Sequence, residues 1–173
     1  MAYVTRDRQR EIDQIINGIY LATNQRYPDC GLIDILSRYG VDVAEYNFGD
    51  ESDKVMGAIK FPEPDKGVDR PIILVNESRP DTNKTFTLAH EFGHYMLHKK
   101  EGMKFRLDTY DYSADTEDMQ QEAEANYFAG AILMPREELL RLVSTTSDLD
   151  EVAKYFGVSR GALNVRLTWI ANN

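Results

Sequence analysis

The chain has 173 residues, of which 42% are hydrophobic and 28% are charged, and its formal net charge is −9. This length and balance suit one globular domain, or one domain with a small appendage. The negative charge argues against sequence-independent nucleic-acid binding, which needs clustered lysine and arginine, but it is compatible with recognition of a basic protein.

The N-terminal segment Met1–Gln14 is rich in charge and lacks an apolar core, so we expect no signal peptide. No apolar run approaches the length that is needed to cross a bilayer. The lone cysteine, Cys30, permits no internal disulfide and no cysteine-based metal site. These features predict a cytoplasmic protein that does not bind membranes.

Two helices and three short strands are predicted in the first half of the chain. Isoleucines at helical spacing indicate an amphipathic helix from about Arg8 to Thr23, and a second short helix ends at Gly40. Apolar segments between turn-forming residues indicate strands at 41–46, 56–61 and 71–76. We therefore expect an α+β fold with a small three-stranded sheet packed on helices.

All three histidines of the chain lie within nine residues, in a helix predicted from near Pro80 to near His98. His90 and His94 are four residues apart, so both imidazoles lie on one face and can bind the same metal ion. Glu91 is then offset beside the metal, where it can take a proton from a water molecule bound there. This H-E-x-x-H pattern is typical of a zinc hydrolase.

The third ligand is not predicted to be His98. A catalytic zinc site usually has three protein ligands and one open position. On a straight helix, His98 lies two turns from His90, roughly 12 Å at about 1.5 Å per residue, so one ion cannot reach all three histidines. We expect His98 to support the site or to pack nearby.

A second helix, from about Gln121 to the region before Pro135, supplies two glutamate candidates. Glu122 lies on a face of small residues that can pack tightly against Gly93. Glu124 points roughly 200° away from Glu122 and is expected to be a solvated helix charge. We therefore predict Glu122 as the third ligand.

Asn126 lies one helical turn after Glu122, where it can hydrogen-bond a ligating histidine. Between the two helices the sequence is loop-like, and Tyr110 or Tyr112 in this stretch could stabilise an oxyanion, although loop tyrosines are usually packed or exposed. Acidic residues crowd the same region as a solvated loop or as a patch that steers a cationic substrate: Asp108, Asp111, Asp115, Glu117 and Asp118.

After a short helix predicted at 137–143, the segment 149–167 has the pattern of a helix-turn-helix, with Gly157 in the turn and Ser159 as N-cap. A DNA-reading helix needs outward basic and amide side chains, for which Arg160, Asn164 and Arg166 are the candidates. Acidic residues at 148, 150 and 151 cancel this charge. We expect a structural helix pair or a docking surface for a protein, and no direct contact with nucleic acid.

Three segments together resemble the ImmA/IrrE family of zinc metallopeptidases. They are Phe86–His94, Glu122–Ala129 and Leu133–Pro135, in the family's order and separation. The resemblance implies a zincin-like fold with one zinc ion. It also implies the roles of individual residues, with His90, His94 and Glu122 as ligands and Glu91 as general base.

The resemblance further implies a substrate. Members of the family cleave or inactivate repressors of phages, mobile elements or stress responses, and many carry a helix-turn-helix domain before the peptidase segment. There is no room for one before position 71, so we expect the repressor to be a separate protein. An edge strand beside the active-site helix commonly receives the substrate in zincin-like peptidases, and we expect the Gly57–Phe61 strand to have this role.

Two other functions stay open at this stage. A metal-binding antirepressor could inactivate its partner by binding without proteolysis, and a regulator could bind DNA through the C-terminal helices. Zinc is inferred from ligand type, since two imidazoles and a carboxylate also suit manganese or iron. We expect residues 1–143 to form the peptidase domain and residues 144–173 to form a C-terminal helical subdomain packed on it.

Overall fold

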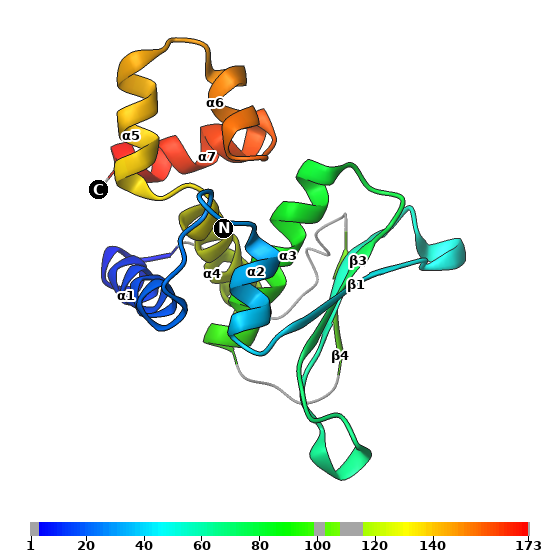
Figure 1. Cartoon of the computed structure of the whole chain (residues 1–173). Coiled ribbons are helices and arrows are strands. Elements are labelled where there is room, and N and C mark those ends of the chain that lie inside the picture. The colour runs from blue at the N-terminus through cyan, green and yellow to red at the C-terminus, as the bar shows by residue number, and fades with distance from the viewer. Residues whose placement is uncertain (1–3, 99–102, 108–115, 173) are drawn as a thin grey trace.

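The computed structural model describes residues 4–98, 103–107 and 116–172 (Figure 1). These residues form an α+β fold, which confirms the expected class. The helices are α1 (Arg6–Thr23), α2 (Leu32–Arg38), α3 (Asp81–Leu97), α4 (Thr116–Leu133), α5 (Arg136–Thr145), α6 (Leu149–Tyr155) and α7 (Arg160–Ala171). The strands are β1 (Asp42–Tyr46), β2 (Val55–Lys60), β3 (Ile72–Asn76) and β4 (Met103–Leu107).

The sheet has four strands in the order β1-β3-β2-β4, so the expectation of three strands was wrong. β1 and β3 are parallel, whereas β2 runs antiparallel to both of its neighbours. The additional strand β4 comes from a stretch that we expected to be a loop. Its residues, Met-Lys-Phe-Arg-Leu, do alternate between apolar and charged, which is a strand pattern.

The edge-strand role expected for Gly57–Phe61 is also wrong. β2 is hydrogen-bonded to β3 along one edge and to β4 along the other, and Val55–Ile59 are all buried. An unbroken apolar run is what a strand covered on both faces requires. The edges of the described sheet are β1 and β4.

Helix α3 lies directly against the sheet at Gly57. A Cβ atom at this position would lie 2.6 Å from the carbonyl oxygen of Leu74 and 2.6 Å from Cγ2 of Thr87. The missing side chain therefore lets α3 approach β2 closely, which fixes the helix beneath the sheet.

On its other side, α3 packs against α4, and Gly93 meets Phe128. A Cβ atom at Gly93 would lie 3.1 Å from Cδ1 of Phe128. The atoms nearest to Gly93 belong to Phe128, which is not part of the small-residue face that was expected there. The aromatic ring fills the space that Gly93 leaves, and this contact sets how α4 is turned toward α3.

The C-terminal helices form the expected helix-turn-helix-like pair, and they lie together with α5 at one end of the molecule, beyond the sheet (Figure 1). Gly157 has a φ of +60° in the turn, and the Ser159 hydroxyl accepts a hydrogen bond from the amide of Ala162. The expected division into residues 1–143 and 144–173 stays a prediction. Among the described residues, no helix is long and apolar enough to cross a membrane.

Arg166 departs from the outward position that a DNA-reading side chain would take. It is buried, its Nε donates to the carbonyl oxygen of Met134 at 3.2 Å, and its guanidinium lies 5.5 Å from the ring centroid of Tyr127. Arg160 is bound to Asp150 on the neighbouring helix at 3.0 Å. These contacts hold the helices together, and Arg166 is withdrawn from the surface.

Candidate metal centre

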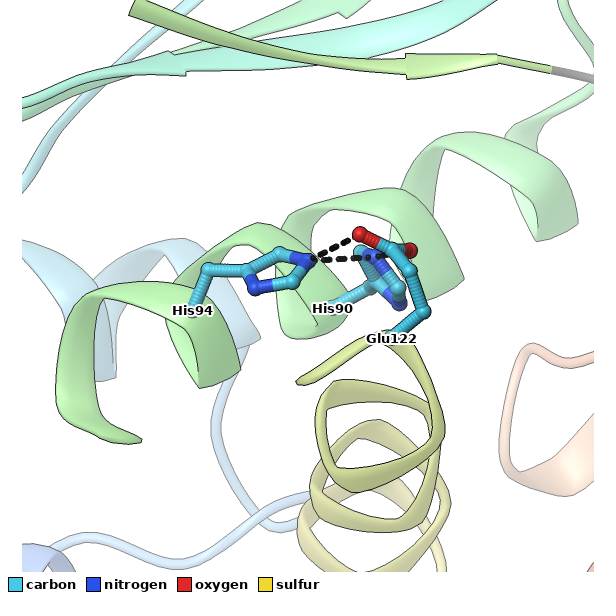
Figure 2. Close-up of side chains that lie close together, drawn as sticks. All are labelled: His90, His94 and Glu122. Atoms are coloured by element: carbon cyan, nitrogen blue, oxygen red, sulfur yellow. Dashed lines mark hydrogen bonds and ion pairs between the residues drawn. The ribbon is translucent and has the colours of Figure 1, made fainter. Parts of the chain in front are cut away.

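Helix α3 places the two imidazoles of His90 and His94 side by side, and α4 brings the carboxylate of Glu122 to them (Figure 2). The two Nε2 atoms are 3.0 Å apart. Oε2 of Glu122 lies 3.1 Å from Nε2 of His90, and Oε1 lies 3.0 Å from Nε2 of His94. Three side chains that can each bind a metal therefore converge on one point.

This donor set fits a zinc ion. Two ligand atoms about 2.0 Å from a tetrahedral zinc ion are about 3.3 Å apart, which is close to the observed separations. His90 and His94 are buried, whereas the Glu122 side chain keeps 22% of its surface exposed. The site is thus enclosed on the histidine side and reachable from solvent on the glutamate side. His90, His94 and Glu122 form a group that could hold a metal ion.

The ring of His90 is oriented by Asn126, whose Oδ1 lies 2.9 Å from Nδ1 of the imidazole. A carbonyl oxygen can only accept, so Nδ1 of His90 carries the proton. Nε2 then keeps its lone pair and points toward Glu122. This contact is the one that the sequence predicted for Asn126.

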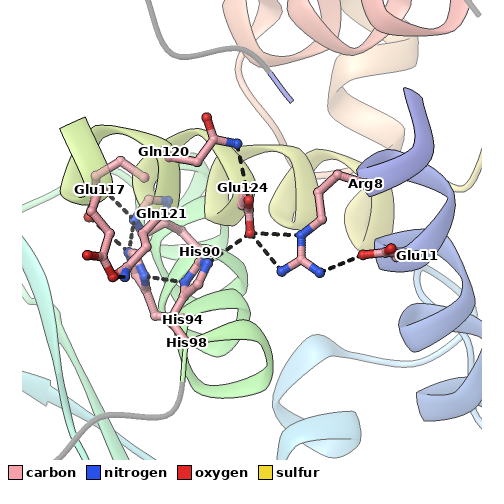
Figure 3. A network of polar contacts seen from close by, with 10 residues as sticks. Arg8, Glu11, His90, His94, His98, Glu117, Gln120, Gln121 and Glu124 are labelled. Carbon is pink, nitrogen blue, oxygen red and sulfur yellow. Dashed lines mark hydrogen bonds and ion pairs between the residues drawn. The ribbon is translucent and has the colours of Figure 1, made fainter. Parts of the chain in front are cut away.

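His98 contacts His94 at Nδ1, the ring nitrogen that faces away from Glu122. Its Nδ1 lies 3.1 Å from Nδ1 of His94, and its Nε2 lies 3.1 Å from Oε2 of Glu124 (Figure 3). The backbone of His98 has left the helix, since its φ and ψ are −129° and 44°. Because α3 ends there, the ring of His98 folds back onto His94 and lies beside the site.

Glu124 is buried with 8% of its surface exposed, so the expectation of a solvated helix charge was wrong. Its Oε2 accepts hydrogen bonds from Nε and Nη2 of Arg8 at 3.0 and 2.8 Å, and its Oε1 accepts one from Gln120 at 3.1 Å (Figure 3). Burial alone would raise the pKa of Glu124, but the hydrogen bonds from Arg8, Gln120 and His98 lower it below its ordinary value. Glu124 is therefore a buried carboxylate held ionised by its neighbours.

Arg8 is a residue of this site that the sequence did not indicate. It lies in α1, 116 positions before Glu124, in a helix that we expected only to cover the core. Its pattern of neighbours in the sequence is that of an ordinary solvent-facing arginine. Only the packing of α1 against α4 brings it to the metal centre.

Burial is the largest influence on Glu122 and raises its pKa. In their charged forms, with a proton on Nε2 as well, His90 and His94 donate hydrogen bonds to the carboxylate, and these outweigh burial and lower its pKa. The carboxylate is thus in the ionised form that binds metals. Glu91 is buried with 1% of its surface exposed, in the same turn of α3 as His90. Tyr110, Tyr112, Asp108, Asp111 and Asp115 lie outside the described residues.

The model of a peptidase family, the IrrE N-terminal-like domain, matches residues 36–168. The chain belongs to this family. The match confirms the resemblance inferred from the histidine and glutamate segments. Arg8 lies before the matched residues, so the IrrE N-terminal-like domain here receives a contact from outside them.

Two relatives of this IrrE N-terminal-like protein are informative. It is similar to the uncharacterized immunity region protein 2 of Bacillus phage phi105, with 27% identity over 134 residues that cover 78% of this chain and 77% of that protein. Its fold is similar to that of a Mycobacterium tuberculosis transcriptional regulator, with a TM-score of 0.58 and 20% identity. The alignment covers 94% of this chain but only 49% of the regulator, so this chain spans about half of that structure.

Proposed function

We propose that this IrrE N-terminal-like protein is a zinc-dependent endopeptidase that hydrolyses a peptide bond in a separate helix-turn-helix repressor. The observation that carries the proposal is the convergence of His90, His94 and Glu122, whose donor atoms lie 3.0 to 3.1 Å apart. The phage immunity protein among its relatives supports a repressor as the substrate class. A net charge of −9 suits a basic, DNA-binding partner.

In this proposal, His90, His94 and Glu122 hold one zinc ion. Zinc in such a site lowers the pKa of a bound water and polarises the scissile carbonyl. Asn126 keeps the His90 proton on Nδ1, so that Nε2 offers its lone pair. When His94 binds through Nε2, its Nδ1 donates to His98, and Nε2 of His98 donates to Glu124.

Glu91 is assigned the proton transfers. It takes the proton of the attacking water as the peptide carbonyl is attacked, and it then passes this proton to the leaving amine. Burial at 1% exposure excludes bulk water from this carboxylate and keeps it next to His90. One carboxylate therefore acts first as base and then as acid, as two-step peptide hydrolysis requires.

The substrate is proposed to bind along β4. This strand is an edge of the described sheet, and its other edge is paired with β2. An extended peptide can add to such an edge through main-chain hydrogen bonds. β4 takes the role that the sequence suggested for the β2 region, because β2 has both of its edges occupied.

The test begins with zinc content, measured by elemental analysis on protein purified without chelators. The unmodified chain and Glu91→Gln are expected to hold one zinc ion per chain, and Glu122→Ala is expected to hold none. Zinc-loaded protein is then incubated with a helix-turn-helix repressor from the same source, and products are identified by mass spectrometry. Glu91→Gln is expected to slow cleavage by about 100-fold or more.

Three outcomes would contradict the proposal. Full cleavage by Glu91→Gln would remove Glu91 from the mechanism. Relief of repression by Glu91→Gln to the level of the unmodified chain, with the repressor intact, would favour the antirepressor that acts by binding. Absence of zinc from every variant, even after zinc is added back, would favour the same alternative.

A further inference from the structure

A cavity of about 370 Å³ lies between α3, α4 and α7, beside the metal centre. Its walls include Phe86 of α3 and Met56 of β2 on one side, and Ala162, Val165 and Trp169 of α7 on the other. The proposed mechanism uses neither this cavity nor α7. The C-terminal helices thus form part of a concave surface next to the site.

The cavity connects to the metal centre through Asn126. This residue lines the cavity, and its Oδ1 lies 2.9 Å from Nδ1 of His90. Phe86 lies one helical turn before His90, on the same side of α3. The cavity therefore starts immediately behind one predicted ligand, within the reach of a single side chain from a peptide bound there.

The cavity also lies at one end of the proposed substrate strand. Met56 occupies an irregularity of β2, where Val55 pairs with Leu107 and Gly57 pairs with Arg106 of β4. At such a bulge, the side chain of the extra residue, here Met56, no longer follows the alternation of side chains between the two faces of the sheet. A peptide added along β4 would thus pass the cavity near the carboxyl end of that strand.

The described walls favour an uncharged and largely apolar group. Beside their apolar side chains they contain only polar, uncharged ones, from Thr82, Asn83, Asn126 and Ser159. None of the lining residues that the structure describes carries a formal charge, although 28% of the chain is charged. Val165 is 49% exposed at the rim, so the cavity opens to solvent. A charged side chain that entered would lose its hydration without gaining a partner.

Gly130 makes this wall possible. A Cβ atom at Gly130 would lie 3.2 Å from Cζ3 of Trp169, so the glycine lets the indole ring lie against α4. The ring of Trp169 is also tilted against Tyr127, with centroids 5.2 Å apart. The wall formed by α7 is therefore held rigidly against the helix that carries Glu122.

We propose that this cavity receives one large apolar side chain of the peptide substrate, next to the scissile bond. The inference rests on the proposed peptidase function and deepens it, because it makes α7 a determinant of substrate specificity. The C-terminal helix pair then contributes to choosing the protein that is cleaved, and needs no contact with DNA to do so.

The test measures the binding of two small hydroxamates to the zinc-loaded full chain by titration calorimetry. Acetohydroxamic acid carries a metal-binding group alone, and 3-phenylpropanohydroxamic acid adds an apolar ring. Burial of the ring is expected to make the second probe bind at least about tenfold more tightly than the first. A third probe, the monohydroxamate of succinic acid, carries a carboxylate in place of the ring. It is expected to bind no more tightly than acetohydroxamic acid.

Val165→Glu places a charge at the rim and is expected to reduce the ratio between the two affinities to about one. Leu140→Glu is the matched control, since Leu140 is 41% exposed on α5 and does not line the cavity, and it is expected to keep the full ratio.

If acetohydroxamic acid binds but the phenyl ring adds no affinity, the cavity proposal is wrong and the metal centre stands. The same holds if the ratio survives Val165→Glu. If zinc-loaded protein binds no hydroxamate, the proposed function fails and the cavity proposal fails with it.

Discussion

Nε2 of His98 lies 3.1 Å from Oε2 of Glu124, and this contact joins the metal centre to the N-terminal helix. On one side of the pair, His98 touches His94. On the other, Glu124 is bound by Arg8 of α1. A chain of part-buried polar contacts therefore runs from a predicted ligand to a helix that lies before the family match. Such outer contacts orient ligands and tune their affinity for metal.

Removing Glu124 or Arg8 from this chain of contacts is expected to weaken zinc binding. Glu124→Ala and Arg8→Met should each raise the zinc dissociation constant about tenfold, because His98 would no longer hold the ring of His94. Competition with a chromogenic chelator measures this. Glu11→Gln is the control, since Glu11 also binds Arg8 but its side chain is 61% exposed. Unchanged affinity in Arg8→Met would show that α1 does not support the centre.

Removal of the metal is expected to lower the melting temperature. A ligand that binds only the folded state stabilises it by about 2.7 kcal/mol at a free concentration 100 times its dissociation constant. For a chain of this size, that is roughly 5 to 11 °C in Tm. Chelator should therefore shift the Tm of the zinc-loaded chain but leave that of Glu122→Ala in place. An equal shift in both would place the stabilising metal elsewhere.

Gly93→Ala is expected to destabilise the protein by about 1 to 3 kcal/mol, through overpacking against Phe128. The Phe128 ring is fully buried and lies edge-on to Phe92, with centroids 5.7 Å apart, so it has no room to yield. Chemical denaturation measures the difference. Gly18→Ala in α1 is the matched control, because no atom lies within 4 Å of its added Cβ. This control should stabilise the chain by about 0.5 to 1 kcal/mol.

The two arginines of α7 are expected to differ in their effects. Arg166→Ala should cost about 2 to 3 kcal/mol, because it removes a buried charged donor from the Met134 carbonyl and opens a gap beside Tyr127. Arg160→Ala should change stability by less than about 0.5 kcal/mol, because its ion pair with Asp150 is exposed. Denaturant titration separates the two. Equal losses of stability in the two variants would show that the buried contacts of Arg166 contribute no more than the exposed ion pair of Arg160.

Asp13 is expected to make stability depend on pH. Burial raises its pKa above the ordinary value of 3.8, despite the nearby charge of Arg166 and the hydrogen bond donated by Tyr127. With a raised folded-state pKa, its stabilising contribution is complete below about pH 3.8 and is lost as pH rises through the folded-state value. Asp13→Asn should therefore raise the free energy of unfolding at pH 7.

The same variant should have no stabilising effect below pH 3.8, where Asp13 is already protonated. Denaturation at a series of pH values tests this. A lower stability of Asp13→Asn at pH 7 would mean that the attraction between Asp13 and Arg166 outweighs the cost of burial.

The helices, and the ligands that lie on them, follow from local rules. Four residues are about one turn of a helix, so His90 and His94 share a face whatever surrounds them. The same rule separates Glu122 from Glu124 on α4, and Ser159 caps α7 through a bond within its own first turn. The two proposed histidine ligands, the contact of Asn126 and the turn at Gly157 could therefore be inferred from spacing alone.

Other features arise from contacts between distant parts of the chain, and periodicity carries no information about them. β4 pairs with β2, which the sequence did not predict. Because of this pairing, β4 and not β2 is an edge strand of the described sheet. Arg8 and Glu124, 116 positions apart, meet only because α1 packs on α4. The Arg166 side chain points inward because it binds the carbonyl oxygen of Met134 and the ring of Tyr127 there. A charged side chain looks solvent-exposed in the sequence until folding supplies its partner, and only tertiary packing does so.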